Sequence, residues 1–170
     1  SITPAQINNG SDDNCSVATL VLDQTAFTCA NTGANTVTLT VTDGSGNAST
    51  CTATVTVQDN LLPTISCPAN ITVSNDAGVC GAAVTYVTPL GADNCPGAVT
   101  TRTAGLASGA TFPIGTTTVT HLVTDASGNT DLCVAQVTVL DTIAPIVVCQ
   151  DITVPIGANG TVTITASQIN

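Results

Sequence analysis

The chain has 170 residues and a formal net charge of −10, with Arg102 as its one basic residue against eleven acidic residues, all of them aspartate. This charge excludes the basic patches with which proteins bind nucleic acids or anionic membrane surfaces. No run of eighteen apolar residues is present, so we expect no membrane insertion. The acidic balance suits cations such as calcium, which prefer carboxylate oxygens.

The chain has eight cysteines, but only two Phe, one Tyr and no Trp, so its core must consist of Val, Ile, Leu and Ala. A small domain with such a light core usually needs covalent cross-links. The cysteine number is even, and the cysteines form no cluster at metal-ligand spacing, which favours disulfides over zinc. Because disulfides persist outside the reducing cytosol, we expect an extracellular protein, either secreted or on the cell surface.

Residues 1–59 are predicted to be the later strands of a first type of repeat. Apolar residues alternate with threonines in Val37–Val41 and again in Cys51–Val57, which is the period of a half-buried strand. Gly and Asn in the intervening segment Asp43–Asn47 favour a hairpin loop. The two segments therefore predict a β-hairpin.

Residues 60–142 are predicted to be a complete domain of a second type. The hairpin pattern returns there, with matched positions shifted by 82 residues and no gap, which indicates tandem β-domains. Earlier strands are expected at Ile71–Val73 and Ala82–Val87, followed by a corner at Asp93–Cys95. We expect an all-β fold of successive domains.

Residues 143–170 are predicted to be the opening strands of the next first-type repeat, at Ile152–Val154 and Thr161–Thr165. The last eight residues, Thr163–Asn170, repeat the first eight, Ser1–Asn8, at an offset of 162. We therefore expect the chain to be a window on a longer protein of alternating repeats.

Five motifs of the second-type repeat together resemble the hyalin repeat (HYR) domain family: Cys67–Val73, Gly78–Val84, Asp93–Cys95, Phe112–Gly115 and Val123–Asn129. The resemblance implies immunoglobulin-like β-sandwiches and a role in extracellular adhesion. Its motifs Asp93–Cys95 and Phe112–Gly115 are similar to those in tandem repeats of very large Bacteroidota surface proteins, including gliding-motility adhesins. The first-type repeat resembles a shorter partner repeat of the same proteins, but it lacks a counterpart of Cys80 and gains Cys29.

The sandwich implied by this resemblance suggests a disulfide pairing. Its first strand starts at the end of the domain where its last strand begins, so Cys67 and Cys133 are expected to meet there. The same logic pairs Cys51 with Cys149, or with the equivalent of Cys149 one period upstream. The remaining expected pairs are Cys15–Cys29, as a local hairpin closure, and Cys80–Cys95.

Aspartates are concentrated in the corners, hairpin loops and linkers that are expected to meet where one domain follows another. Converging carboxylates could hold Ca²⁺, which takes six to eight oxygen ligands. The alternative is that these aspartates only cap ordinary turns. The candidate ligands are Asp12, Asp13, Asp43, Asp59, Asp93, Asp125 and Asp141.

No catalytic function is expected. The sole histidine, His121, aligns with Leu39 and should face the core, and the sequence contains no nucleophile elbow or phosphate-binding loop. Thr142 lies in Asp141–Ile143, a tripeptide that resembles a short Bacteroidota O-glycosylation site.

We predict a structural stalk repeat of a long extracellular bacterial adhesin or surface filament. Its partners would be neighbouring repeats of the same chain, with a host-surface glycan or protein bound by a distal tip outside this segment. The alternative is that the repeats themselves bind a glycan or protein, with or without calcium. In a variant of the first hypothesis, residues 143–170 complete the open domain of a neighbouring molecule.

Overall fold

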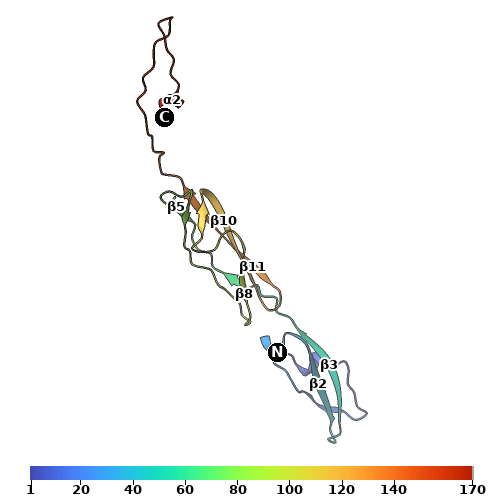
Figure 1. The fold of residues 1–170 in the computed structure, drawn as a ribbon. Helices are drawn as coiled ribbons and strands as arrows, with labels where there is room; N and C mark the ends of the chain where they lie inside the picture. The colour runs from blue at the N-terminus through green and yellow to red at the C-terminus, as the bar shows by residue number, and fades with distance from the viewer. Residues whose placement is uncertain (170) are drawn as a thin grey trace.

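A computed structural model describes residues 1–169 and confirms the all-β prediction. A three-stranded sheet near the N-terminus is followed end to end by a four-stranded sheet, and an extended segment continues beyond it (Figure 1). Among residues 1–169, no helix has both the length and the hydrophobicity needed to cross a lipid bilayer.

The elements in chain order are α1 (Pro4–Ile7), β1 (Val17–Leu22), the 3₁₀ turn η1 (Cys29–Asn31), β2 (Gly33–Asp43), β3 (Ala48–Val57), β4 (Thr64–Ile65), β5 (Ile71–Ser74), β6 (Gly81–Ala83), β7 (Gly91–Ala92), β8 (Val99–Ala104), β9 (Thr111–Pro113), β10 (Gly115–Thr124), β11 (Thr130–Leu140) and α2 (Ala166–Ile169).

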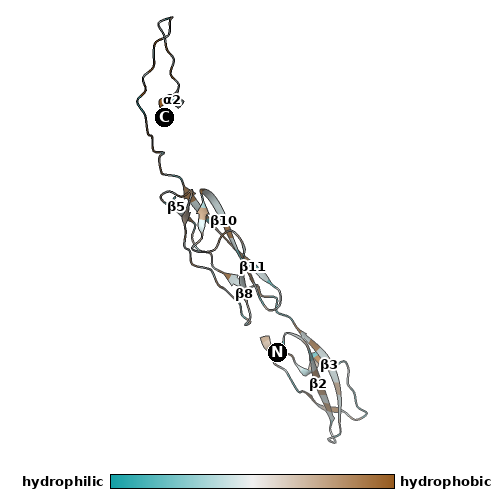
Figure 2. Cartoon of the chain, in the orientation of Figure 1, coloured by the Kyte–Doolittle hydropathy of each residue, from teal (hydrophilic) through white to brown (hydrophobic). Residues whose placement is uncertain are grey.

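The first sheet has the strand order β1-β2-β3, and both pairs are antiparallel. The predicted hairpin is confirmed, because β2 and β3 pair from Gly33 opposite Val57 to Thr42 opposite Ala48. A small core of Leu22, Val37 and Leu39 lies on one face of this sheet. Figure 2 shows both apolar (brown) and more polar (pale to teal) stretches along β2 and β3.

The second unit has a four-stranded sheet, β5-β11-β10-β8, and two short strand pairs, β4-β7 and β6-β9. Its core lies between the layers. Phe112 on β9 is fully buried and belongs to one cluster with Ala82 of β6, Val119 of β10 and Val137 of β11. His121 is 3% exposed, so the expectation that it faces the interior is confirmed.

The first and last strands of this sheet, β5 and β11, pair in parallel, with Ile71 opposite Val137 and Ser74 opposite Leu140. This register places the segment before β5 beside the start of β11. It therefore brings Cys67 next to Cys133, as the sandwich geometry implied.

Strands β3 and β11 are equivalent positions of the internal repeat, but they differ in their surroundings. β11 has the parallel neighbour β5, whereas the outer edge of β3 has no paired strand in the described part of the chain. Val137 is 3% exposed, while its counterpart Val55 is only half-buried. Within residues 1–169, the first sheet therefore has no counterpart of β5.

The strands predicted at Ile152–Val154 and Thr161–Thr165 do not form. A strand needs a hydrogen-bonding partner, and residues 143–169 extend away from both sheets (Figure 1). The strand predicted at Ala82–Val87 is limited to β6. Asn170 lies outside the described residues, and the division at residues 59 and 142 stays a prediction.

Candidate functional site at the junction of the two units

The linker between β3 and β4 is held by the β10–β11 hairpin loop. The Asn129 side chain donates from Nδ2 to the backbone oxygens of Asp59, at 3.0 Å, and Leu61, at 3.1 Å. The linker also forms a turn of its own, because the Leu61 amide donates to Asp59 Oδ1 at 3.2 Å. The first unit is thus attached to the second through a fixed backbone segment.

Asp125 organises this loop. Its Oδ1 accepts from the backbone amides of Ser127 and Asn129, at 2.9 and 2.8 Å, and its Oδ2 accepts from Asn129 Nδ2 at 2.8 Å. Burial raises the pKa of the Asp125 carboxyl, but the hydrogen bonds from Asn129 and Ser127 outweigh this and leave the pKa below its ordinary value of 3.8. Asp125 is therefore an ionised turn former that orients the Asn129 amide.

A disulfide joins the two units directly at this junction. Cys29, at the start of η1, is bonded to Cys95, in the corner between β7 and β8. The expected pairs Cys15–Cys29 and Cys80–Cys95 were therefore wrong. Both predicted pairs lie within a single repeat. The observed bridge instead crosses from one unit to the next, because η1 and the Asp93–Cys95 corner face each other at the junction.

The other cysteines divide into one bridge and four thiols. Cys67 and Cys133 are bonded, as expected. Within residues 1–169, the remaining four are free and exposed: Cys15, Cys51, Cys80 and Cys149. The expected bond between Cys51 and Cys149 of the same chain does not form, because the segment with Cys149 projects beyond the opposite end of the molecule (Figure 1).

Two of the predicted calcium ligands converge at the junction. One carboxylate oxygen of Asp59, one of Asp93 and the Cys95 sulfur lie within 4.8 Å of one another. The sulfur is in a disulfide and is not a thiolate ligand, so the cluster supplies two carboxylates. Asp59 Oδ2 is completely buried and has no hydrogen-bond partner within the described part of the chain.

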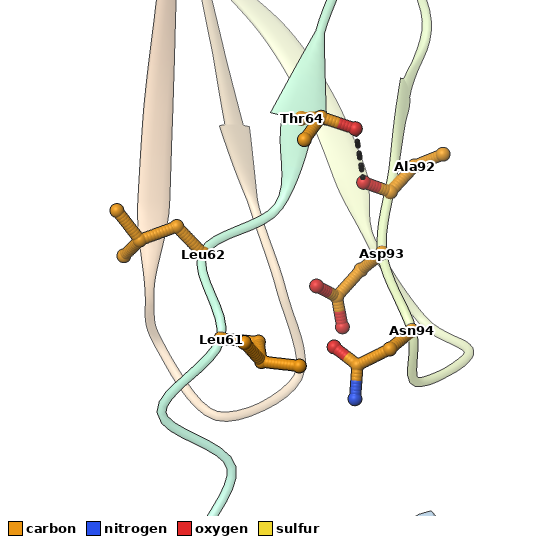
Figure 3. Close-up of a pocket in the computed structure, with 6 residues that line it drawn as sticks. All are labelled: Leu61, Leu62, Thr64, Ala92, Asp93 and Asn94. Carbon is orange, nitrogen blue, oxygen red and sulfur yellow. Dashed lines mark hydrogen bonds between the residues drawn. The ribbon is translucent and has the colours of Figure 1, made fainter.

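The adjoining groove is lined by the linker and the corner. Figure 3 shows Asp93 and Asn94 pointing towards Leu61, with Thr64 Oγ1 donating to the Ala92 carbonyl at 3.3 Å. Asp93 Oδ2 accepts from the Cys95 amide at 2.9 Å. When the Asn94 amide is oriented to satisfy its neighbours, its nitrogen donates to both oxygens of Asp93, at 3.1 and 3.2 Å.

The residues fit a divalent cation in part. Asp59 and Asp93 are hard oxygen donors, and the unpartnered Asp59 Oδ2 is a group that a cation would satisfy. Asp59 Oδ2 differs in this respect from the carboxylates of Asp93 and Asp125, because both oxygens of each of those already accept hydrogen bonds.

The other predicted ligands lie away from this cluster. Asp43 and Asp13 stabilise turns at the end of the first sheet that lies away from the junction. Hydrogen bonds from the Asn47 side chain and backbone hold the pKa of Asp43 below its ordinary value. Asp13 caps the Cys15 amide at 2.9 Å. Asp12 is in the same corner, and Asp141 follows β11.

The aromatic side chains have structural roles. Phe112 is fully buried, and Phe27 packs on the first core. The Tyr86 hydroxyl donates to the Leu106 carbonyl at 2.6 Å, and its ring meets His121 edge-on, with ring centres 6.1 Å apart. Among the described residues, none of the three is left as an open stacking surface for a sugar.

The linker is anchored by the side-chain nitrogen of Asn129, a contact that the sequence motifs did not predict. The Cys29–Cys95 bridge was not predicted either. The available signal was the Asp-Asn-Cys motif, which occurs at Asp13–Cys15 and again at Asp93–Cys95. In the described part of the chain the second copy carries the bond between the units, through Cys95, while Cys15 of the first copy is a free thiol.

Comparisons with known proteins agree with this architecture. Residues 58–139 match the HYR domain family. The chain is 40% identical over 119 residues to hyalin of Strongylocentrotus purpuratus, covering 66% of the chain and 10% of hyalin. It is 34% identical over 122 residues to hyalin of Lytechinus variegatus, covering 69% of the chain and 23% of that protein.

A third relative is the serine-rich adhesin for platelets of Staphylococcus aureus, which is 33% identical over 109 residues. That match covers 57% of this chain and 5% of the adhesin. The chain therefore spans only a small part of each of these three relatives.

Proposed function

Since residues 58–139 form an HYR domain, we propose that this chain is a stalk segment of an extracellular adhesion protein, which holds a distal binding region away from the surface that carries it. Its relatives include two hyalins and an adhesin that are much longer than the matched region, which suits a repeated spacer. The disulfides support a location outside the reducing cytosol.

The observation that carries the proposal is the covalent junction between the units. A short linker alone would leave two domains free to reorient. Here the Cys29–Cys95 bridge closes a second connection across the same junction, and Asn129 fixes the linker backbone. Two separate attachments restrict bending, and a stalk needs this restriction.

Small-angle X-ray scattering tests this role. The variant C29A/C95A removes the bridge between the units, and C67A/C133A removes a bridge inside the second unit with the same sequence separation of 66 residues. We expect the first variant to show a wider distribution of end-to-end distances, while the second, measured where it remains folded, keeps the wild-type distribution. Equal distributions in wild type and C29A/C95A would refute the stiffening role.

Calcium at the junction is a second element of the proposal, and the buried, unpartnered Asp59 Oδ2 is the observation that favours it. Asp59 and Asp93 would hold the ion, with water or backbone oxygens completing its shell. Calorimetric titration with CaCl₂ is expected to detect binding that is lost in D59N/D93N and retained in the control D12N/D13N. An absence of binding in the wild-type chain would leave these residues as turn formers.

The alternative, in which the repeats themselves bind a glycan or protein ligand, is less well supported because the three aromatic side chains are occupied. A glycan-array measurement with the isolated chain separates the two functions. Specific binding would favour the ligand-binding function, and the stalk proposal expects none.

A further inference from the structure

The disulfide between the two units lies beside two carboxylates. One carboxylate oxygen of Asp59, one of Asp93 and the Cys95 sulfur are within 4.8 Å of one another. We propose that these two aspartates form an electrostatic gate at the Cys29–Cys95 bridge, which slows its reduction by anionic thiols such as glutathione and favours cationic thiols as the reductant. The inference rests on the proposed stalk function only for its consequence, because opening this bridge would free the junction, and its test measures the rate of bond cleavage.

The backbone holds both carboxylates near the sulfur. Asp93 Oδ2 accepts a hydrogen bond from the Cys95 amide at 2.9 Å, so this carboxylate and the bridge belong to one turn. Asp59 comes from the linker, whose backbone is bound by the Asn129 side chain at 3.0 Å. The two carboxylates therefore reach the bridge from separate segments, and each segment has its own anchor.

The charge of this pair is poorly compensated. Asp59 Oδ2 is completely buried and has no hydrogen-bond partner among residues 1–169. The only basic side chain of the whole sequence, Arg102, lies on β8 and donates to the Gly105 carbonyl. Where little water is present to screen them, two negative charges repel each other more strongly than they do in bulk water. The pair should therefore oppose any negative charge that develops at Cys95.

The other half of the bridge also faces oxygen. The backbone oxygen of Asn94 lies 3.7 Å from the Cys29 sulfur, which directs the negative end of a carbonyl dipole at it. Cys29 is half-buried, so a small thiol can reach it from solvent. A thiolate that approaches either sulfur of the bridge therefore meets an oxygen-rich surface.

Reduction of the bridge consumes two molecules of a thiol. The thiolate of the first attacks one sulfur in line with the sulfur–sulfur bond, forms a mixed disulfide with that cysteine and releases the other cysteine as a thiolate. A second thiolate attacks the mixed disulfide, forms the disulfide of the reductant and releases the remaining cysteine. Two electrons pass to the bridge, and the two thiol protons of the reductant end on Cys29 and Cys95.

Both directions of attack place negative charge at the gate. Attack on Cys95 brings the incoming thiolate to the sulfur that lies beside Asp59 and Asp93. Attack on Cys29 leaves the departing charge on Cys95, at the same position. Coulomb repulsion therefore raises the barrier in either case, and this repulsion disappears when the two carboxylates are replaced by amides.

The charge of the reductant decides how strongly the gate acts. Glutathione has a net negative charge once its thiol is ionised, whereas the thiolate of cysteamine is offset by an ammonium group. The groove next to the bridge, about 290 Å³ in volume, leads past Asp93, which lies in its wall (Figure 3). A cationic thiol is therefore attracted along a path that repels glutathione. The other residues that line the groove carry no charge: Leu61, Leu62, Thr64, Ala92 and Asn94.

The Cys67–Cys133 bridge provides a reference within the same chain. Cys133 is 0% exposed and stands opposite His121 in the β10–β11 pair. In the described part of the chain, neither cysteine of this bridge belongs to a cluster with carboxylates like the one at Cys95. The rate of its reduction should therefore be independent of the charges at the junction.

Reduction rates of the full 170-residue chain test the gate. D59N/D93N removes the two charges and keeps side-chain oxygens that can accept the same backbone hydrogen bonds. The control D12N/D13N removes the same number of charges from the corner before β1, away from the junction. The four free thiols are first blocked with N-ethylmaleimide, and EDTA keeps the comparison independent of calcium. Thiols released after measured times are alkylated, and mass spectrometry of peptic peptides follows each bridge separately.

We expect glutathione to open the Cys29–Cys95 bridge about tenfold faster or more in D59N/D93N than in wild type, because two nearby charges no longer oppose the reaction. Cysteamine should gain roughly threefold or less, since its ammonium group offsets the repulsion. D12N/D13N should differ from wild type by less than about twofold with either thiol, because exposed charges at a distance are screened by salt. The rate at Cys67–Cys133 should be the same in all three chains.

Equal glutathione rates in wild type and D59N/D93N would overturn the inference, and so would the same acceleration in D12N/D13N. An equal gain with both thiols would also overturn it, because the substitutions would then loosen the junction without any effect of charge. A measurement on the wild-type chain needs no substitution. Raising NaCl from about 0.02 M to about 0.5 M should accelerate glutathione more than cysteamine at Cys29–Cys95, since salt screens the repulsion. The same salt dependence with both thiols would refute the gate.

Discussion

The linker anchor can be tested with two asparagines in equivalent hairpin loops. Asn129 donates to the Asp59 and Leu61 carbonyls as well as to its own loop, whereas Asn47 bonds within its loop only. N129A should therefore release the linker, and N47A should not. The two substitutions remove the same chemical group from the same type of turn, so their difference isolates the linker contacts.

The expected magnitude follows from the proton count of the Asn129 amide. Its two protons serve three acceptors, Asp125 Oδ2 and the Asp59 and Leu61 carbonyls, so the linker contacts together amount to about one hydrogen bond. Such a bond is worth about 0.5–1.5 kcal/mol net, so N129A should weaken the local structure of the linker by about that much more than N47A. A difference of about 1.4 kcal/mol corresponds to a factor of ten in the opening equilibrium, so the protection of the Leu61 amide should fall by roughly two- to twelvefold in N129A.

Hydrogen exchange at the Leu61 amide is the appropriate measurement, because this amide donates within the linker turn. Thermal stability would be ambiguous, since Asp125 is only 6% exposed and the loss of its partner affects the second unit as well. The samples should be kept dilute and reduced at the four free thiols. Equal Leu61 exchange rates in N129A and N47A would refute the anchoring role.

Burial lowers the pKa of His121 below its ordinary value of 6.5, and the nearby Arg102 charge lowers it further. The unfolded chain therefore binds the proton at a higher pH than the folded chain does. As a result, the free energy of unfolding should fall as pH drops below about 6.5. H121L, which introduces the residue found at the equivalent position 39, should reduce that loss in urea titrations at pH 5 and pH 7.5; an unchanged pH dependence would contradict it. F112A removes a side chain with 0% exposure and should cost about 3–5 kcal/mol in urea unfolding, whereas a cost below about 1 kcal/mol would show that the core rearranges. C67A/C133A opens a loop with a sequence separation of 66 residues and should lower the free energy of unfolding by about 4 kcal/mol on the chain-entropy estimate. Calorimetry measures this loss when the variant is compared with the wild-type chain in its oxidised and reduced forms.

The sequence contained enough information for the elements whose signals are local. The hairpins could be predicted because strand alternation and a Gly-Asn loop occur within twenty residues, and the inward orientation of His121 followed from its alignment with Leu39. The meeting of Asp59 with the Asp93 corner followed from domain order alone. Each of these depends on periodicity or on the repeat.

The features that could not be predicted depend on what lies beside a segment. Ile152–Val154 has the pattern of a strand, but it remains unpaired because no sheet edge is near it in this chain. Cys29 was matched with the nearby Cys15, although the fold turns it towards the following unit. Local spacing does not reveal a contact between two units.

The parallel pairing of β5 with β11 has a mechanical consequence. When the second unit is pulled at its two ends with the Cys67–Cys133 bond reduced, β5 and β11 are drawn in opposite directions along their length, so their hydrogen bonds are loaded together in shear. The intact bond instead carries the tension from Cys67 to Cys133 and bypasses β5, which lies inside the loop that the bond closes. The chain between these cysteines has a sequence separation of 66, roughly 220 Å when extended, and it would stay folded and unavailable for stretching while the bridge is intact. Reduction would release that length, so the redox state of the surroundings would set how far the unit can extend under force.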